Sequence, residues 1–123
     1  MSTSPDYLDY LRELFAPLGS IRTRRMFGGA GVYCDEVFIA LVIDDILFLK
    51  TDEQNRADFE REGLEPFCYE SEGRRITLSY YRAPDEALDS AALMQPWAHS
   101  AMGAALRAKQ AKTPGRKRKK ACP

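Results

Sequence analysis

The sequence predicts an α+β domain of two layers, in which an antiparallel sheet packs against helices. Apolar residues recur at helical spacing near both ends of the chain, and between them the period changes to that of strands. A chain of 123 residues can bury one core but not two. We therefore expect one folded domain over residues 1–110, in the order helix, three or four strands, helix, two strands, helix.

The first helix is expected to begin after Ser4. Serine is a favoured N-cap, and Pro5 suits the first helical position. Pro17 and Gly19 supply the stop. The apolar residues of this segment recur every three or four positions, as on one face of a helix: Tyr7, Leu8, Leu11, Leu14, Phe15 and Leu18.

The segment that follows the first helix, to about residue 50, has the composition of several strands. Two of these strands are apolar on both faces. "VFIALVI" and "ILFL" lack the alternation of a sheet with one wet face. Because a chain this short has few helices to cover a second face, we expect a homodimer. The expected strands lie near 22–27, 30–34, 37–43 and 46–50, with two-residue turns at Asp35-Glu36 and Asp44-Asp45.

The second half of the chain should add one polar helix, two strands and a last helix. In residues 51–65, Thr51 and Gln54 have the spacing of a capping box, and Gly63 fits a helix stop. "PFCYE" and "RRITLSYYR" indicate strands, and "APDEAL" indicates a helical turn. Small residues at helical spacing predict a last helix over residues 97–111, able to approach a sheet closely.

Charge is distributed unevenly. Residues 1–106 contain 10 Lys and Arg against 18 Asp and Glu, whereas the last 17 residues contain eight bases and no acid. We expect residues 111–123 to be disordered. The run of basic residues in this tail suits weak, salt-sensitive contact with nucleic-acid phosphates. The alternative is that the tail only increases solubility. The run comprises Arg116, Lys117, Arg118, Lys119 and Lys120.

Composition also bears on compartment. Three cysteines without a CxxC spacing argue against a disulfide framework and for a reducing environment. No apolar run approaches the length of a membrane span, and the first residues do not resemble a signal peptide. We expect a cytoplasmic protein that does not contact a membrane.

The stretch "RRMFGGAG" raises the question of a phosphate site, because glycines and arginines both bind phosphates. Gly29 and Gly31 give G-x-G, but Cys34 occupies the third glycine position, and a strand follows where a helix should. No Walker sequence is present. We favour a glycine bend between strands, and keep anion binding by Arg22, Arg24 and Arg25 as the alternative.

Candidate catalytic residues are sparse. His99 is the only histidine and has no partner at useful spacing for a triad or a metal. Asp44-Asp45 is better explained by a turn, and Cys34 and Cys68 by burial in strands. Base stacking by Tyr80, Tyr81 or Trp97 is a weaker alternative. We expect no enzyme activity, no cofactor and no metal.

Several segments together resemble the N-terminal domain of the TfoX/Sxy family: "TRRMFGGAGVY", "LFLKTD", "NRADFEREG", "PFCYE", "LSYYRAP" and "ALMQPWAHSAM". The resemblance covers roughly residues 5–110. The residues that match the most unusual family segments are Arg24, Arg25, Met26, Phe27, Gly28, Gly29, Gly31, Tyr80, Tyr81 and Pro84.

The resemblance implies a fold similar to that of type III secretion chaperones, often dimeric. It also implies regulation of competence (DNA-uptake) genes, as a co-activator that works with a transcription factor. It implies neither a cofactor nor catalytic residues. Full-length members add a C-terminal helical domain, whereas this sequence continues into a short basic arm, so we expect the stand-alone form of the domain.

Overall fold

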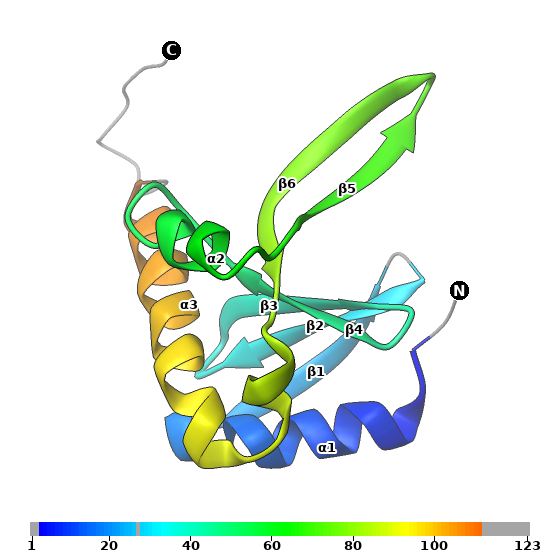
Figure 1. Ribbon diagram of the computed structural model, residues 1–123. Helices are drawn as coiled ribbons and strands as arrows, with labels where there is room; N and C mark the ends of the chain where they lie inside the picture. The colour runs from blue at the N-terminus through cyan, green and yellow to red at the C-terminus, as the bar shows by residue number, and fades with distance from the viewer. Residues whose placement is uncertain (1–2, 27, 112–123) are drawn as a thin grey trace.

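The computed structural model describes residues 3–26 and 28–111. It contains one six-stranded antiparallel sheet, with helices before, within and after it (Figure 1). The predicted α+β class and order of elements are therefore confirmed, with four strands in the first group. The elements are α1 (Pro5–Phe15), η1 (Ala16–Leu18), β1 (Ile21–Met26), β2 (Gly29–Cys34), β3 (Val37–Ile43), β4 (Ile46–Lys50), α2 (Arg56–Arg61), β5 (Pro66–Ser71), β6 (Arg74–Arg82), η2 (Asp85–Leu88) and α3 (Ala91–Ala111).

The sheet order is β1-β2-β3-β4-β6-β5, so the first four strands form a meander. Its tight turns are Asp35-Glu36 and Asp44-Asp45, where all four residues have positive φ. Positive φ at both central positions matches the twist of a two-residue hairpin. The last hairpin turns at Glu72-Gly73 with the same backbone geometry.

The hydrophobic core lies between one face of the sheet and the helices. Val32, Ala40, Leu49 and Tyr81 are paired in one row across four strands, and all four are buried. Leu11, Phe15, Met94, Ala98 and Ala101 pack against this face from α1 and α3. The alanines of α3 allow the helix to lie close to the sheet, as their spacing predicted.

Ser4 caps α1 as expected, with its hydroxyl accepting a hydrogen bond from the Tyr7 N–H at 3.1 Å. The capping box expected at Thr51 and Gln54 is wrong. The Thr51 N–H instead continues strand pairing by donating to Ser79 O, and α2 begins only after Asn55. The Asp52 carboxylate accepts hydrogen bonds from the Gln54 and Asn55 N–H groups, so this segment forms a turn before the helix.

The last helix starts six residues earlier than predicted, at Ala91. Pro96, which has no N–H and is disfavoured inside a helix, stands just before the expected start at Trp97. The structure carries Pro96 within α3, and the Ser90 hydroxyl accepts a hydrogen bond from the Leu93 N–H at the true beginning. No helix among the described residues is long and apolar enough to cross a membrane.

Candidate interaction surface

The face of the sheet that points away from the helices is the candidate functional site. One row of paired residues crosses it from β1 to β6: Arg24, Gly31, Leu41, Phe48 and Arg82. Residues directly opposite one another in a sheet point to the same side. None of the five belongs to the core cluster formed with the helices. We call this side of the sheet, over β1 to β6, the outer face.

The outer face is rich in aromatic side chains that contact one another. Tyr33 stacks on Phe38 with ring centroids 5.0 Å apart, and Phe38 lies 5.9 Å from Tyr80. Phe48 lies 5.1 Å from Phe67. These contacts partly shield the face without a helix, and Tyr80 is buried although it lies outside the core cluster.

Burial has an electrostatic consequence at Tyr80. Loss of solvation, with a smaller contribution from Tyr33, raises the pKa of the Tyr80 phenol to about 12. The Lys50 ammonium lies 4.9 Å from the centre of this ring. Tyr80 is therefore a neutral, apolar wall of the outer face at any physiological pH.

The hairpin of β5 and β6 extends the outer face beyond the body of the molecule. It projects as an arm, away from the helices and the first four strands (Figure 1). No residue from Phe67 to Ser79 is buried. One side of this arm is apolar and continues the outer face, since Tyr69 is paired with Ile76 and stacks near Phe67. The other side holds Cys68, Glu70, Arg75 and Thr77.

The base of the arm and the β3–β4 hairpin enclose an open hollow of about 340 Å³. Ile43, Ile46 and Phe48 line it from the body, and Phe67 lines it from the arm. Charged groups at its border are Asp44, Glu65, Arg75 and Arg82. The hollow therefore combines an apolar lining with charged groups at its border.

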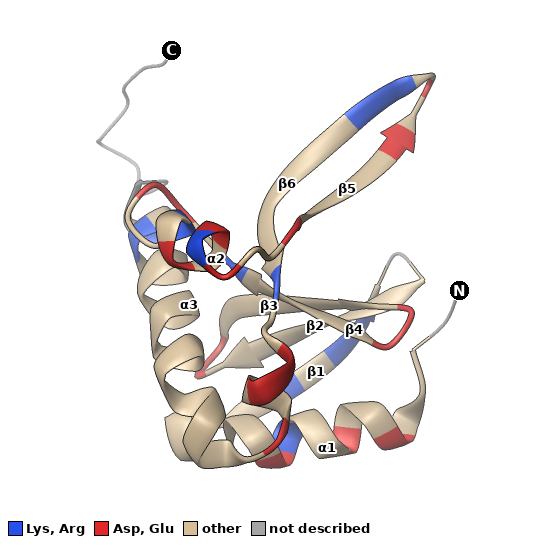
Figure 2. Cartoon of the chain, viewed as in Figure 1, with Lys and Arg blue, Asp and Glu red and all other residues tan. Residues whose placement is uncertain are grey.

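The charged residues on the outer face have one sign. Among the described strand residues that point to this side, the charged ones are Arg22, Arg24, Lys50, Arg74 and Arg82, and none is a carboxylate. Acidic residues lie at its border, in the turns (Figure 2). The face therefore differs from the rest of the body, which carries more acid than base.

Of these five cations, Arg22 and Lys50 have local partners, and Arg82 borders the hollow. The Arg22 guanidinium donates to Glu36 at 2.7 Å and lies 4.7 Å above the Tyr33 ring. This pairing lowers the pKa of the Glu36 carboxyl. Lys50 lies over Tyr80. Arg24 and Arg74 are exposed and make no hydrogen bond or ion pair with any described residue.

The glycines of "RRMFGGAG" lie at a strand-to-strand connection. Gly28 is in the turn with φ of 77°, and Gly29 and Gly31 are in β2. A Cβ on Gly29 would lie 2.1 Å from the Val42 carbonyl oxygen, so only glycine fits there. Arg25 donates to the Thr3 carbonyl oxygen at 2.6 Å. The first strand thus sends Arg24 and Arg25 in opposite directions, and they do not converge on one anion site.

The remaining residues singled out from the sequence are scattered. Tyr81 lies on the core face of the sheet, whereas its neighbour Tyr80 lies on the outer face. The Tyr81 hydroxyl donates a hydrogen bond to the Glu60 carboxylate at 2.8 Å. Pro84 is buried before η2, and His99 is exposed on α3. Phe27 and the basic run Arg116–Lys120 lie outside the described residues. Among residues 3–26 and 28–111, no group of three or more His, Cys, Asp or Glu could hold a metal ion.

The two cysteines in strands differ. Cys34 is buried as predicted, and burial raises the pKa of its thiol. The expectation of burial is wrong for Cys68, because its strand belongs to the projecting arm. Hydrogen bonds with Thr77 and Arg75 lower the pKa of the Cys68 thiol.

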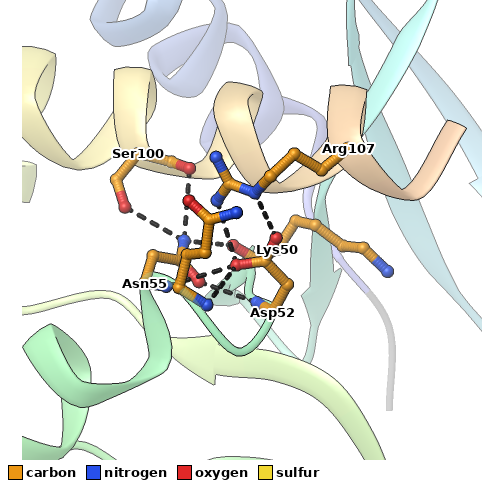
Figure 3. Close-up of polar contacts among 6 residues, drawn as sticks. Lys50, Asp52, Asn55, Ser100 and Arg107 are labelled. Atoms are coloured by element: carbon orange, nitrogen blue, oxygen red, sulfur yellow. Dashed lines mark hydrogen bonds and ion pairs between the residues drawn. The ribbon is translucent and has the colours of Figure 1, made fainter. Parts of the chain in front are cut away.

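A second polar cluster joins the start of α2 to α3 (Figure 3). The buried Asn55 side-chain amide donates to Lys50 O and to the Ser100 hydroxyl, and its oxygen accepts from the Asp52 N–H. Arg107 donates to Asp52 at 2.9 Å and lowers the pKa of that carboxyl. These groups satisfy one another, so the cluster fastens two elements together and is not a binding site.

Sequence reasoning missed most of the outer face. Phe48, Lys50, Phe67, Tyr69 and Arg82 were not singled out, because each looks ordinary in its own strand. The available signal was the failure of β3 and β4 to alternate, which indicates that both sides of the sheet require cover. Which cations share that side depends on register across the sheet.

Comparison with known proteins gives a consistent result. Residues 13–105 match the family described as the TfoX N-terminal domain. Protein Sxy of Escherichia coli (strain K12) is 35% identical over 77 residues, which are 63% of this chain and 36% of Sxy. The matched segment thus spans about a third of the length of that relative.

Proposed function

Because the chain belongs to the TfoX N-terminal domain family, we propose that it is a non-enzymatic regulatory domain that acts by binding another protein. The process we propose is transcriptional control of competence genes, the role that the resemblance to TfoX/Sxy proteins implies. The observation that supports this function is the outer face, an aromatic and apolar surface continued onto a projecting arm. Most of its apolar side chains are half-buried and Tyr69 is 44% exposed, and apolar patches at the surface of soluble domains mark interaction sites.

The composition of this face supports protein binding. Aromatic residues, Met and Arg are enriched at protein interfaces, and Asp and Glu are depleted. The strand residues of the outer face follow this pattern, with Tyr69, Phe67 and Arg24 as accessible examples. The face also has no convergent set of acid, base and nucleophile among the described residues.

The test is complementation of a strain that lacks the gene, with transcripts of DNA-uptake genes as the measurement. The wild-type chain should restore them, and Tyr69→Ser combined with Ile76→Ser should not, because the arm loses its apolar side. Leu106→Ser is the matched control, since Leu106 on α3 is 43% exposed and Tyr69 is 44% exposed. Unchanged transcripts in the deletion strain would refute a regulatory role in competence.

A second candidate is contact with nucleic acid through Arg116–Lys120. Five adjacent bases favour it, because each phosphate neutralised releases a counterion. Binding of a duplex oligonucleotide should then weaken steeply with salt and disappear on replacement of these five residues by Gln. Binding that survives the replacement would move the contact to another surface, and no binding at low salt would exclude this candidate.

A further inference from the structure

We propose that the outer face, with the hollow at the base of the arm, binds an acidic amphipathic segment of a protein partner. This inference rests on the proposed function and specifies the chemistry of its partner. The segment would present apolar side chains to the hollow and carboxylates to the surrounding arginines. A free surface of this kind is identified by what complements it in shape, polarity and charge.

The apolar part of the match is set by the hollow and the arm. Ile43, Ile46 and Phe48 line one wall, and Phe67 lines the other. Above the hollow, Tyr69 and Ile76 continue the apolar surface along the arm, with 44% of Tyr69 exposed. A two-stranded hairpin is marginally stable by itself in water. Burial of this side by a partner would therefore stabilise the arm as well as the complex.

The charged part of the match comes from cations at both ends of the face. Arg24 lies on β1 and Arg74 near the tip of the arm, and neither has a partner among the described residues. Arg82 lies between them, paired with Phe48 and bordering the hollow. Carboxylates spaced along a bound segment would neutralise these groups. Acids at the border, such as Asp44, lie in turns, and the strand residues that point to the outer face include no carboxylate.

A second copy of this chain is a poorer occupant of the same face. A two-fold dimer joined through the outer faces would set two faces against each other on which the charged strand residues, Arg22, Arg24 and Arg82 among them, are all positive. Like charges facing across an interface cost free energy. The rest of the body is acidic. Contact between the acidic surface of one copy and the outer face of another would be head-to-tail, and head-to-tail contacts form rings or open filaments.

Nucleic acid also fits less well. Stacking of bases requires free aromatic ring faces. The Tyr33 ring lies between the Arg22 guanidinium and Phe38, and the Tyr80 ring is approached by Lys50 and Phe38. Phe48 and Phe67 pack against each other, and Phe67 stacks on Tyr69. A protein segment uses such a surface better than a strand of phosphates and bases does.

The test measures binding of fluorescent peptides to the full chain by anisotropy. One 16-residue probe carries Leu or Phe at every third or fourth position and Glu elsewhere, and a second replaces each Glu by Lys. We expect the acidic probe to bind and the basic probe not to bind. Arg24→Glu and Arg74→Glu should each weaken binding of the acidic probe about fivefold. Arg61→Glu on α2 should leave this binding unchanged.

Each other result overturns the proposal. Equal binding of both probes would show that the cations do not select the partner. Unchanged binding of the acidic probe to the Arg24→Glu and Arg74→Glu variants would show the same. Displacement of the acidic probe by oligo-dT would assign the face to nucleic acid. Sedimentation as a dimer that Tyr69→Ser dissociates would assign it to a second copy. Thermal melts of every variant separate loss of binding from loss of fold.

The outcome can be separated from that of the proposed function. If Tyr69→Ser with Ile76→Ser abolishes complementation but the acidic probe does not bind, the regulatory surface stands and the acidic partner fails. If the probe binds as expected but complementation is unaffected by the same substitutions, the binding chemistry stands and the regulatory role of this face fails.

Discussion

Leu49 and Phe48 are neighbours on β4, yet they point to the two sides of one sheet. Leu49 is fully buried against the helices, whereas Phe48 contacts Phe67 of the arm and lines the hollow on the outer face. The helix-covered side is closed by α1 and α3, and the polar side chains of Asn55 and Tyr81 have hydrogen-bond partners there. The outer side has equally apolar residues but no covering helix. The comparison shows that apolar residues on the helix-covered side stabilise the fold, whereas apolar residues on the outer side remain accessible to a partner.

Truncation of the two neighbours should give the largest contrast. Leu49→Ala should destabilise the domain by about 2–5 kcal/mol, because it opens a cavity in a closed core. Phe48→Ala should cost less in stability, since Phe48 is only partly buried. Urea unfolding of both variants measures the difference. A larger loss for Phe48→Ala would mean that the outer face is the more important core.

The polar cluster on the helix-covered side gives the next largest effect. Asn55→Ala removes the amide that joins Lys50 O, Asp52 N and Ser100, and leaves these groups unpaired at a buried position. We expect a loss of about 2–3 kcal/mol in the free energy of unfolding. Gln54→Ala is the control, because its side chain is exposed in the same turn. Equal stability of the two variants would refute the fastening role.

Alkaline titration tests the outer face itself. The Tyr80 pKa is about 12 in the folded chain, against 10 for a free phenol, so the folded state binds more protons between these values. The contribution of Tyr80 to the free energy of unfolding is therefore fully present below pH 10. It falls as the pH rises, by roughly 2 kcal/mol at pH 11.5. Tyr80→Phe should remove this part of the loss. Tyr7 and Tyr81, whose pKa values are also raised, should still contribute theirs.

The smallest effect is expected at the tip of the arm. Glu72 has φ of 54° before Gly73 at 77°, and Asn-Gly is the preferred sequence for this turn. Glu72→Asn should stabilise the hairpin by about 0.5 kcal/mol. Chemical shifts of residues in β5 and β6 would report it. A destabilised arm would mean that the Glu72 side chain has a role that its exposure does not reveal.

The sequence predicted those elements that depend on neighbours along the chain. Ser4 and Pro5 marked the start of α1, and Gly63 at φ of 75° marked the stop after α2. Thr51 was mistaken for a cap because the capping-box spacing does not tell whether a residue still belongs to a strand. The start of α3 was predicted too late, because the helix runs through Pro96 and tertiary contacts hold Met94 and Ala98 in the core.

The candidate site depends on contacts between distant residues, so less of it could be predicted. The apolar runs of β3 and β4 indicated a second face, and this was the useful signal. The pairing of Phe48 with Arg82, and the projection of Tyr69 on an arm, follow from strand order and register. Neither is encoded in local periodicity. The homodimer inferred from the same runs stays a prediction.

The arm has a further consequence for how the molecule moves. Its backbone hydrogen bonds join only two strands over most of its length, and none of its side chains from Phe67 to Ser79 is buried. Such a unit opens without unfolding the core, so its amide hydrogens should exchange with solvent well before those of β2 and β3. A bound partner would slow that exchange. The exchange rates of this one hairpin would therefore report whether the proposed partner occupies the outer face.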